Sequence, residues 1–211
     1  MTAPITFYTN PMSRGRIVRW MLEEVGEPYE TKTLDYGTTM KDPEYLAVNP
    51  MGKVPALRHG QAVVTETAAI CAYLADAFPA AGLAPDPRSP ERGAYLRWLF
   101  FAAGPVESAV TAKAMGLLAP TDKAAMAGYG SYENVVDTLE GAVGSEAYLA
   151  GDRFSAADLY VGSQLGWGLM FGTIEKRPAF EHYVARLQAR PAAIRANALD
   201  DALMPKPDAA T

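Results

Sequence analysis

Two stretches of this chain hold residues whose types and spacing suit the binding of a small peptide. In the first, Val54 precedes Pro55, which has no N–H and belongs at the first position of a strand or on a sheet edge. The backbone N–H and C=O of Val54 can then face outward and pair with an extended peptide as with an added strand. In the second, Glu66 and Thr67 open a helix, whose free N–H groups favour a carboxylate. The Thr67 hydroxyl and the Glu66 anion therefore suit a ligand end that carries both a carboxylate and an ammonium.

Each stretch also has a simpler explanation. Val54-Pro55 would ordinarily be a trans turn, because only about 5–6% of X-Pro bonds in folded proteins are cis. A threonine at 65 or 67 would ordinarily do no more than cap the helix. The occurrence of both stretches so close together in the sequence is what favours a ligand site.

The elements that must position these residues follow from periodicity and turn signals. Strands are predicted over 5–8, 29–34, 54–57 and 62–64, with helices over 16–25, 44–47 and 67–77. The order β-α-β-α-β-β-α indicates a small mixed sheet with helices on its faces, in a domain spanning 1–78. Residues 79–90 contain four prolines and are predicted to be a linker. Residues 91–211 are predicted to be an all-helical domain. Its helices are predicted over 91–118, bent at Gly104-Pro105, over 123–143, loosened by Gly128 and Gly130, and over 155–170, 179–189 and 192–203.

Composition excludes several classes of protein. The chain has 211 residues, 49% of them hydrophobic, and a net charge of −5, without a long run of lysine or arginine. We therefore expect no nucleic-acid partner. No apolar stretch approaches the ~20 residues that span a bilayer, and no secretory signal is evident, so a cytoplasmic protein without membrane association is expected. A single cysteine suits a reducing compartment, and two distant histidines give no metal site.

Four motifs occur in an order that resembles the cytosolic glutathione transferases, in the serine-type form common among bacterial members. They are Tyr8-x-x-Pro-x-Ser-Arg14, Asn49-Pro-x-Gly-Lys-Val-Pro-Ala-Leu, Thr65-Glu-Thr-Ala-Ala-Ile-x-x-Tyr-Leu and Gly151-Asp-x-Phe-Ser-Ala-Ala-Asp158. The resemblance implies a thioredoxin-like βαβαββα domain, an all-helical second domain, and a homodimer. It also implies a cis Val54-Pro55 bond, glutathione lying along Val54 with its γ-glutamyl end at Glu66 and Thr67, and Lys41 and Lys53 near its glycine carboxylate.

Transferase chemistry needs the glutathione thiolate, and a free thiol is only a few per cent ionised at pH 7. Ser13, between the first strand and the first helix, is the leading candidate for a hydroxyl that stabilises the thiolate, although it could merely cap the helix. Tyr8 is a rival and the Asn10 amide a third possibility. Residues 9–16 contain no cysteine, which disfavours a mixed-disulfide mechanism. Cys71 falls in an apolar helical pattern and is predicted to be buried.

The leading functional hypothesis is therefore a glutathione transferase that conjugates the thiolate to small electrophilic, mainly apolar substrates. A glutathione-dependent disulfide or peroxide reductase is an alternative, because it would use the same cradle. A non-catalytic, protein-binding module of transferase-like fold is another. Ser155-Ala-Ala-Asp158 has the spacing of a helix cap, and we expect it to stabilise the helical domain without contacting glutathione.

Overall fold

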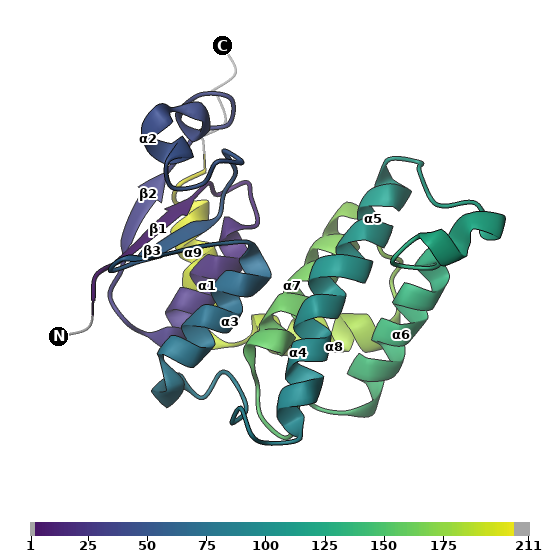
Figure 1. The fold of residues 1–211 in the computed structure, drawn as a ribbon. Coiled ribbons are helices and arrows are strands. Elements are labelled where there is room, and N and C mark those ends of the chain that lie inside the picture. The colour runs from purple at the N-terminus through teal and green to yellow at the C-terminus, as the bar shows by residue number, and fades with distance from the viewer. Residues whose placement is uncertain (1–2, 205–211) are drawn as a thin grey trace, which may run out of the picture. The chain divides into compact units, whose positions relative to one another are not determined.

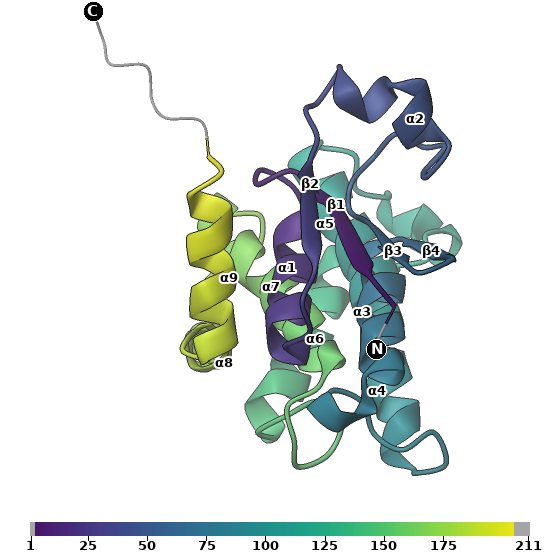
Figure 2. The same ribbon diagram turned by 90° about the vertical axis from the view of Figure 1, so that its left-hand side faces the viewer.

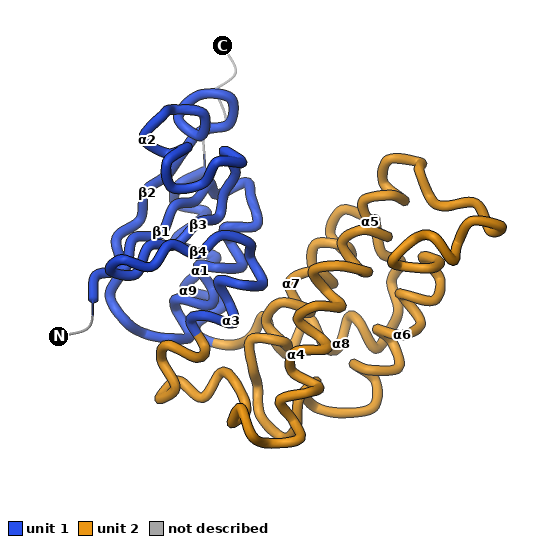
Figure 3. The backbone as a smooth tube through the Cα atoms, viewed as in Figure 1, with its two compact units in different colours: residues 1–74, 191–211 blue, residues 75–190 orange. Residues whose placement is uncertain are grey.

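The structure is a computed structural model that describes residues 3–204 (Figure 1). The chain divides into two compact units (Figure 3). Unit 1 comprises the residues up to 74 and those from 191 onward, and unit 2 comprises residues 75–190. The boundaries 1–78, 79–90 and 91–211 stay a prediction about domains. The compact units differ from them chiefly in where the last helix belongs.

Unit 1 is built on a four-stranded sheet in the order β2-β1-β3-β4. The strands are β1 (Ile5–Thr9), β2 (Glu30–Thr33), β3 (Ala56–His59) and β4 (Ala62–Thr65). Strands β1 and β2 are parallel, and the pairs β1–β3 and β3–β4 are antiparallel. The parallel pair is joined by α1 (Gly15–Val25), as a parallel connection requires.

The remaining elements of unit 1 complete the predicted order. They are η1 (Thr39–Lys41), α2 (Pro43–Leu46) and α3 (Thr67–Ala77), whose end from residue 75 onward falls in unit 2. Figure 1 shows α1 and α3 on the same face of the sheet. On the other face, Tyr8 of β1 packs with Met40 of η1, Tyr45 of α2, Val48 and Ala56. The predicted thioredoxin-like βαβαββα arrangement is confirmed.

The last helix, α9 (Pro191–Asp201), packs against α1 in unit 1, and Figure 2 shows the two side by side. The sequence places a helix over 192–203, and the helix is confirmed. Its partner was not predicted, because helical periodicity identifies an apolar face without indicating which surface will cover it.

Unit 2 is helical. It contains η2 (Pro79–Ala81), α4 (Glu91–Phe101), a π-helical segment η3 (Ala102–Val106), α5 (Glu107–Ala114), η4 (Thr121–Met126), α6 (Tyr132–Ser145), α7 (Ala156–Phe171) and α8 (Pro178–Gln188). Pro105 lies inside the π-helical segment. Proline removes a helical hydrogen bond and clashes with the preceding turn, and this accounts for the local departure from α-helical geometry. A bend at Gly104-Pro105 was predicted, and the structure has a π-helical segment at this position.

The predicted helix over 123–143 is confirmed in its second part, as α6, and is wrong in its first part. Its first part is the short 3₁₀ segment η4, and Gly130 then takes a left-handed φ of 67° that no helix continues through. Helix α6 begins only after Ser131, whose Oγ accepts a hydrogen bond from Asn134 N at 3.1 Å. The prediction took Gly128 and Gly130 only to loosen this helix, and it overlooked Ser131 as the cap at which α6 begins.

The start of α7 has the predicted capping box, in which Ser155 is the N-cap and Asp158 the N3 residue. The Asp158 carboxylate is completely buried and accepts hydrogen bonds from Leu149 N (2.8 Å), Ser155 N (2.9 Å), Ser155 Oγ (2.9 Å) and Tyr183 Oη (2.8 Å). Burial raises the pKa of Asp158, and the donated hydrogen bonds oppose that rise. One side chain thus ties α7 to α8 and to the preceding loop.

Candidate functional site

The register of the sheet brings most of the predicted site residues to one end of unit 1. Ala56 of β3 pairs with Tyr8 of β1 on one side and with Thr65 of β4 on the other. Because both pairings are antiparallel, the residues before Ala56 lie beside those that follow Tyr8 and Thr65. Val54-Pro55, Glu66-Thr67 and the loop 10–14 therefore meet at the same edge of the sheet.

Val54 presents an open backbone at this edge. The Val54-Pro55 bond is cis, as the resemblance implied. Lys53 C=O accepts hydrogen bonds from Tyr45 Oη (2.5 Å) and Asn49 Nδ2 (2.8 Å), which fix the residue before Val54. Within residues 3–204, neither the N–H nor the C=O of Val54 has a hydrogen-bond partner. Both groups are therefore available to an added strand.

Tyr45 and Asn49 were missed as site residues. Burial raises the pKa of Tyr45 to about 12, so its hydroxyl keeps the proton that it donates to Lys53. The Asn49 Oδ1 accepts a hydrogen bond from Met51 N at 3.1 Å, which is an Asx turn. The Asn49-Pro50 pair could have signalled that turn. The hydrogen bond from Tyr45 to Lys53 forms because α2 packs against the loop before Val54. No local sequence signal predicts that packing.

Glu66 has an unusual backbone conformation. Its φ is 68°, and it is the one non-glycine residue among 3–204 with positive φ. This left-handed conformation costs an L-residue roughly 1–2 kcal/mol, and such strain is concentrated at functional sites. The Glu66 side chain is exposed, whereas Thr67, the first residue of α3, is buried. This backbone conformation thus places an exposed carboxylate directly before the start of α3.

The two predicted lysines differ in their surroundings. Lys41 Nζ donates to the carbonyls of Gly52 (2.9 Å) and Met51 (3.3 Å), so its ammonium holds the loop that leads into Lys53. Lys53 is exposed and forms no ion pair with any residue in the described part of the chain. Of the two, Lys53 has the ammonium that is available to a ligand carboxylate.

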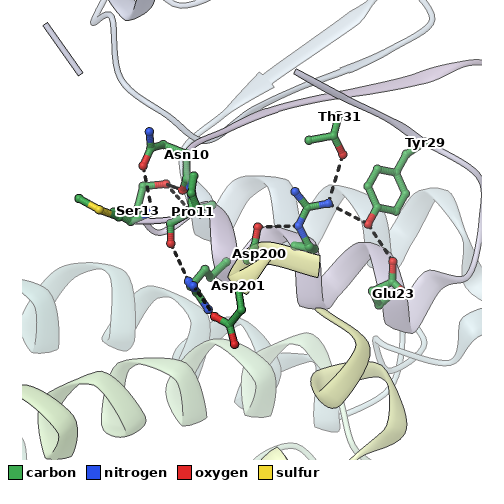
Figure 4. A network of polar contacts seen from close by, with 12 residues as sticks. Asn10, Pro11, Ser13, Glu23, Tyr29, Thr31, Asp200 and Asp201 are labelled. Atoms are coloured by element: carbon green, nitrogen blue, oxygen red, sulfur yellow. Dashed lines mark hydrogen bonds and ion pairs between the residues drawn. The ribbon is translucent and has the colours of Figure 1, made fainter. Parts of the chain in front are cut away.

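Ser13 and Asn10 hold the loop 10–14 together (Figure 4). Ser13 Oγ donates to Asn10 C=O at 2.7 Å and accepts from Gly15 N at 2.9 Å. Asn10 Nδ2 donates to Leu34 C=O at 2.8 Å, and Asn10 Oδ1 accepts from Met12 N at 2.9 Å. Both side chains are buried. The Ser13 hydroxyl must therefore turn away from Asn10 before it can donate to a thiolate.

Tyr8 lies on the α2 face of the sheet. Its ring centroid is 5.5 Å from that of Tyr45, and Lys32 Nζ lies 5.8 Å from its centroid. The neighbouring Phe7 faces the other way, where the Arg19 guanidinium of α1 lies 5.2 Å from its centroid. Tyr8 is thus a packed aromatic residue of the core. Which of Ser13, Tyr8 and Asn10 activates the thiol stays a prediction.

Gly15 allows the loop 10–14 to pack tightly against β1. A Cβ at this position would lie 2.0 Å from Thr9 Oγ1 and 2.9 Å from Ser13 Oγ. The Thr9 side chain is completely buried. A side chain at this position would therefore clash with Thr9. Glycine allows the backbone at the start of α1 to pack directly against the Thr9 hydroxyl at the end of β1.

Cys71 lies inside α3 and is completely buried, as predicted. Burial raises the pKa of its thiol to about 12. We expect the native protein to react negligibly with a thiol reagent at pH 8. Once unfolded in denaturant, each chain should react with one equivalent of the reagent. Reaction of the native chain as fast as that of free cysteine would contradict this burial.

The described residues give neither a metal centre nor a membrane-crossing helix. Among residues 3–204, no group of three or more His, Cys, Asp and Glu side chains is placed to hold a metal ion. In the same part of the chain, no helix is long and apolar enough to cross a bilayer.

Comparison with known proteins places this geometry in a family. Residues 12–77 match the family described as "Glutathione S-transferase, N-terminal domain", and residues 96–191 match "Glutathione S-transferase, C-terminal domain". Glutathione S-transferase hmp2 of Hypomyces subiculosus is 30% identical over 210 residues, which cover 92% of this chain and 98% of that protein.

Solved structures agree. A glutathione transferase from Methylococcus capsulatus str. Bath is 32% identical, with a TM-score of 0.78 over 94% of this chain and 99% of its own. A sphingomonad glutathione S-transferase, solved in complex with glutathione, is 30% identical, with a TM-score of 0.75 over 93% of this chain and 98% of its own. The two family matches lie in both units, and the first includes Ser13, the β3–β4 hairpin and the start of α3. The chain belongs to the glutathione S-transferase family.

Proposed function

We propose that this glutathione transferase binds glutathione as an added strand beside Val54 and adds its thiolate to small electrophilic, mainly apolar compounds. The observation that carries the proposal is the meeting of three features at one sheet edge. These are the open backbone of Val54, the strained Glu66 at the start of α3, and the loop 10–14 at the start of α1. Each suits a different part of the tripeptide.

The two ends of glutathione carry different charged groups and therefore need different partners. The ammonium of the γ-glutamyl end pairs with the Glu66 carboxylate, and its carboxylate accepts from the Thr67 hydroxyl and the first N–H groups of α3. The glycine carboxylate meets Lys53, an exposed contact worth about 1 kcal/mol or less. Lys41 supports this end indirectly, because it holds the carbonyls of the 51–52 loop.

The reaction requires a stabilised thiolate at the start of α1. Each unit by which the thiol pKa is lowered corresponds to about 1.4 kcal/mol of differential stabilisation. A hydroxyl donor and the helix N-terminus supply it together. The thiolate sulfur then forms a bond to the electrophilic carbon. In a substitution, the leaving group departs with the electron pair of the bond that breaks.

Calorimetry with glutathione tests the binding half of the proposal, and the absence of binding would favour the non-catalytic alternative. Turnover with a chlorinated aromatic compound then tests conjugation. A small mixed disulfide, assayed in parallel, tests the reductase alternative. Turnover of the disulfide without conjugation of any electrophile would overturn the transferase proposal in favour of a glutathione-dependent reductase.

Replacement of the candidate hydroxyls tests thiol activation. We expect Ser13→Ala to raise the apparent pKa of bound glutathione by about one unit, the equivalent of about 1.4 kcal/mol, and Tyr8→Phe to leave it nearly unchanged. Thiolate absorbance measured against pH reads this directly. If neither substitution moves the titration, both assignments fail and the Asn10 amide is the next candidate.

We also propose that the protein acts in the cytoplasm as a homodimer. The single cysteine suits a reducing compartment, and the dimer is the assembly that the family resemblance implies. Light scattering at several protein concentrations tests the dimer, and a mass of one chain at every concentration would exclude it.

A further inference from the structure

A buried ion pair fixes α9 on α1. Arg19 Nε lies 2.7 Å from Asp200 Oδ1, and the two side chains are 3% and 0% exposed. Arg19 Nη1 also donates to Tyr29 Oη (3.2 Å) and Thr31 Oγ1 (3.1 Å). Burial opposes the charge of Arg19, yet the adjoining Asp200 carboxylate holds its pKa above the usual value. The position of α9 along α1 is therefore set, and Asp201 follows at a defined place.

Asp201 reaches the loop 10–14 through a single arginine. Arg16 Nη2 lies 2.7 Å from Asp201 Oδ1, and Arg16 Nε donates to Pro11 C=O at 2.6 Å (Figure 4). The planar guanidinium presents its donors in a fixed fork, so the carboxylate that holds one nitrogen also orients the other. Pro11 is flanked by Asn10, and the same loop contains Ser13. Helix α9 is thus connected to this loop by two successive hydrogen bonds, one from Arg16 to Asp201 and one from Arg16 to Pro11.

We propose that Asp201, acting through Arg16, is a positioning residue for the loop that activates the glutathione thiol. The proposal rests on the transferase function proposed above. The Asp201 side chain is 66% exposed and that of Arg16 22%, and such ion pairs contribute only about 0–1 kcal/mol to stability. Their effect on geometry can be larger, because a misplacement of about 1 Å can cost a hundredfold in rate.

Asp201 has two effects on the pKa of the bound thiol, and they have opposite signs. The first turn of α1 contains no acidic residue, and an anion near it opposes the formation of a thiolate through space. Removing Asp201 would by that effect alone lower the thiol pKa. Loss of positioning would instead raise it, because the donors of the loop would no longer be aligned with the sulfur. The direction of the change therefore separates the two effects.

The test compares Asp201→Ala with Arg195→Gln in the full chain. Arg195 links the same two helices through Glu23, with Nε 3.1 Å from Oε2 and Nη2 3.2 Å from the backbone carbonyl, and neither contact involves the loop 10–14. We expect Asp201→Ala to lower kcat about three- to tenfold, to raise the pKa of the bound thiol, and to leave the glutathione Kd within about twofold. Arg195→Gln should change none of these values.

Two further variants and the wild type complete the design. Asp201→Glu should restore most of kcat, and the double variant Arg16→Gln/Asp201→Ala should be no slower than Arg16→Gln alone, because Asp201 acts only through Arg16. A lowered thiol pKa in Asp201→Ala, or kinetics that match Arg195→Gln, would overturn the positioning role while leaving the transferase intact. Failure of the wild type to bind glutathione would instead refute the proposed function itself.

Discussion

Replacing Glu66 by glutamine should weaken glutathione binding by about 10- to 100-fold and leave stability nearly unchanged. The loss follows from a charge-assisted contact with the ligand ammonium, worth about 1.5–3 kcal/mol. Stability should hold because the Glu66 side chain is exposed and glutamine keeps its size and backbone. Calorimetry gives the affinity, and thermal unfolding without ligand gives the stability. The matched control is Glu146→Gln, which removes one exposed carboxylate from unit 2.

Glu66→Gly should separate function from stability further. Glycine adopts a φ of 68° without the penalty of about 1–2 kcal/mol that an L-residue incurs, although it costs roughly 0.5–1 kcal/mol more chain entropy on folding. We therefore expect an unchanged or slightly higher melting temperature together with loss of glutathione binding. Wild-type affinity in both Glu66 variants would show that the carboxylate has no part in recognition.

Replacing Asp158 by alanine should destabilise the protein more than any other substitution considered. The change leaves Leu149 N, Ser155 N, Ser155 Oγ and Tyr183 Oη without their buried acceptor. Each unsatisfied buried donor costs about 1–3 kcal/mol, so even partial relaxation leaves a loss of at least about 3–5 kcal/mol. That is a large share of a typical stability of about 5–15 kcal/mol. Urea unfolding measures the loss.

The same experiment distinguishes a structural role from a binding role. Ser155→Ala removes the cap hydroxyl but keeps the carboxylate, and it should cost only about 1 kcal/mol. The folded fraction of Asp158→Ala should bind glutathione with wild-type affinity, because the residue and all four of its donors lie in unit 2. Weakened binding at an unchanged unfolding midpoint is the result that our assignment forbids.

Much of unit 1 was predictable because its signals are local. The apolar spacing after Arg16 marks α1, the residues around Gly60 mark the hairpin, and Thr67 marks the start of α3. The same stretches carry Val54-Pro55 and Glu66-Thr67, so the glutathione-binding candidates were found with the elements that position them.

The features that sequence reasoning missed depend on contacts between distant residues. Nothing near Asp200 indicates that it will meet Arg19, which lies 181 positions earlier. The donation of the Ser13 proton to Asn10 C=O depends on the turn of the loop, which residue types alone do not specify. The error over 123–143 had a different cause, because helical periodicity was given more weight than Gly130 and the capping Ser131.

The central claim is that glutathione lies along the backbone of Val54 while its γ-glutamyl end docks at the start of α3. Amide NMR spectra recorded during a glutathione titration test it most directly. We predict that the largest shifts occur at the amides of Val54 and Thr67. Saturation at about 100 times Kd should also stabilise the fold by about 2.7 kcal/mol. Unshifted amides at both positions, with an unchanged melting temperature at saturating glutathione, would contradict the claim.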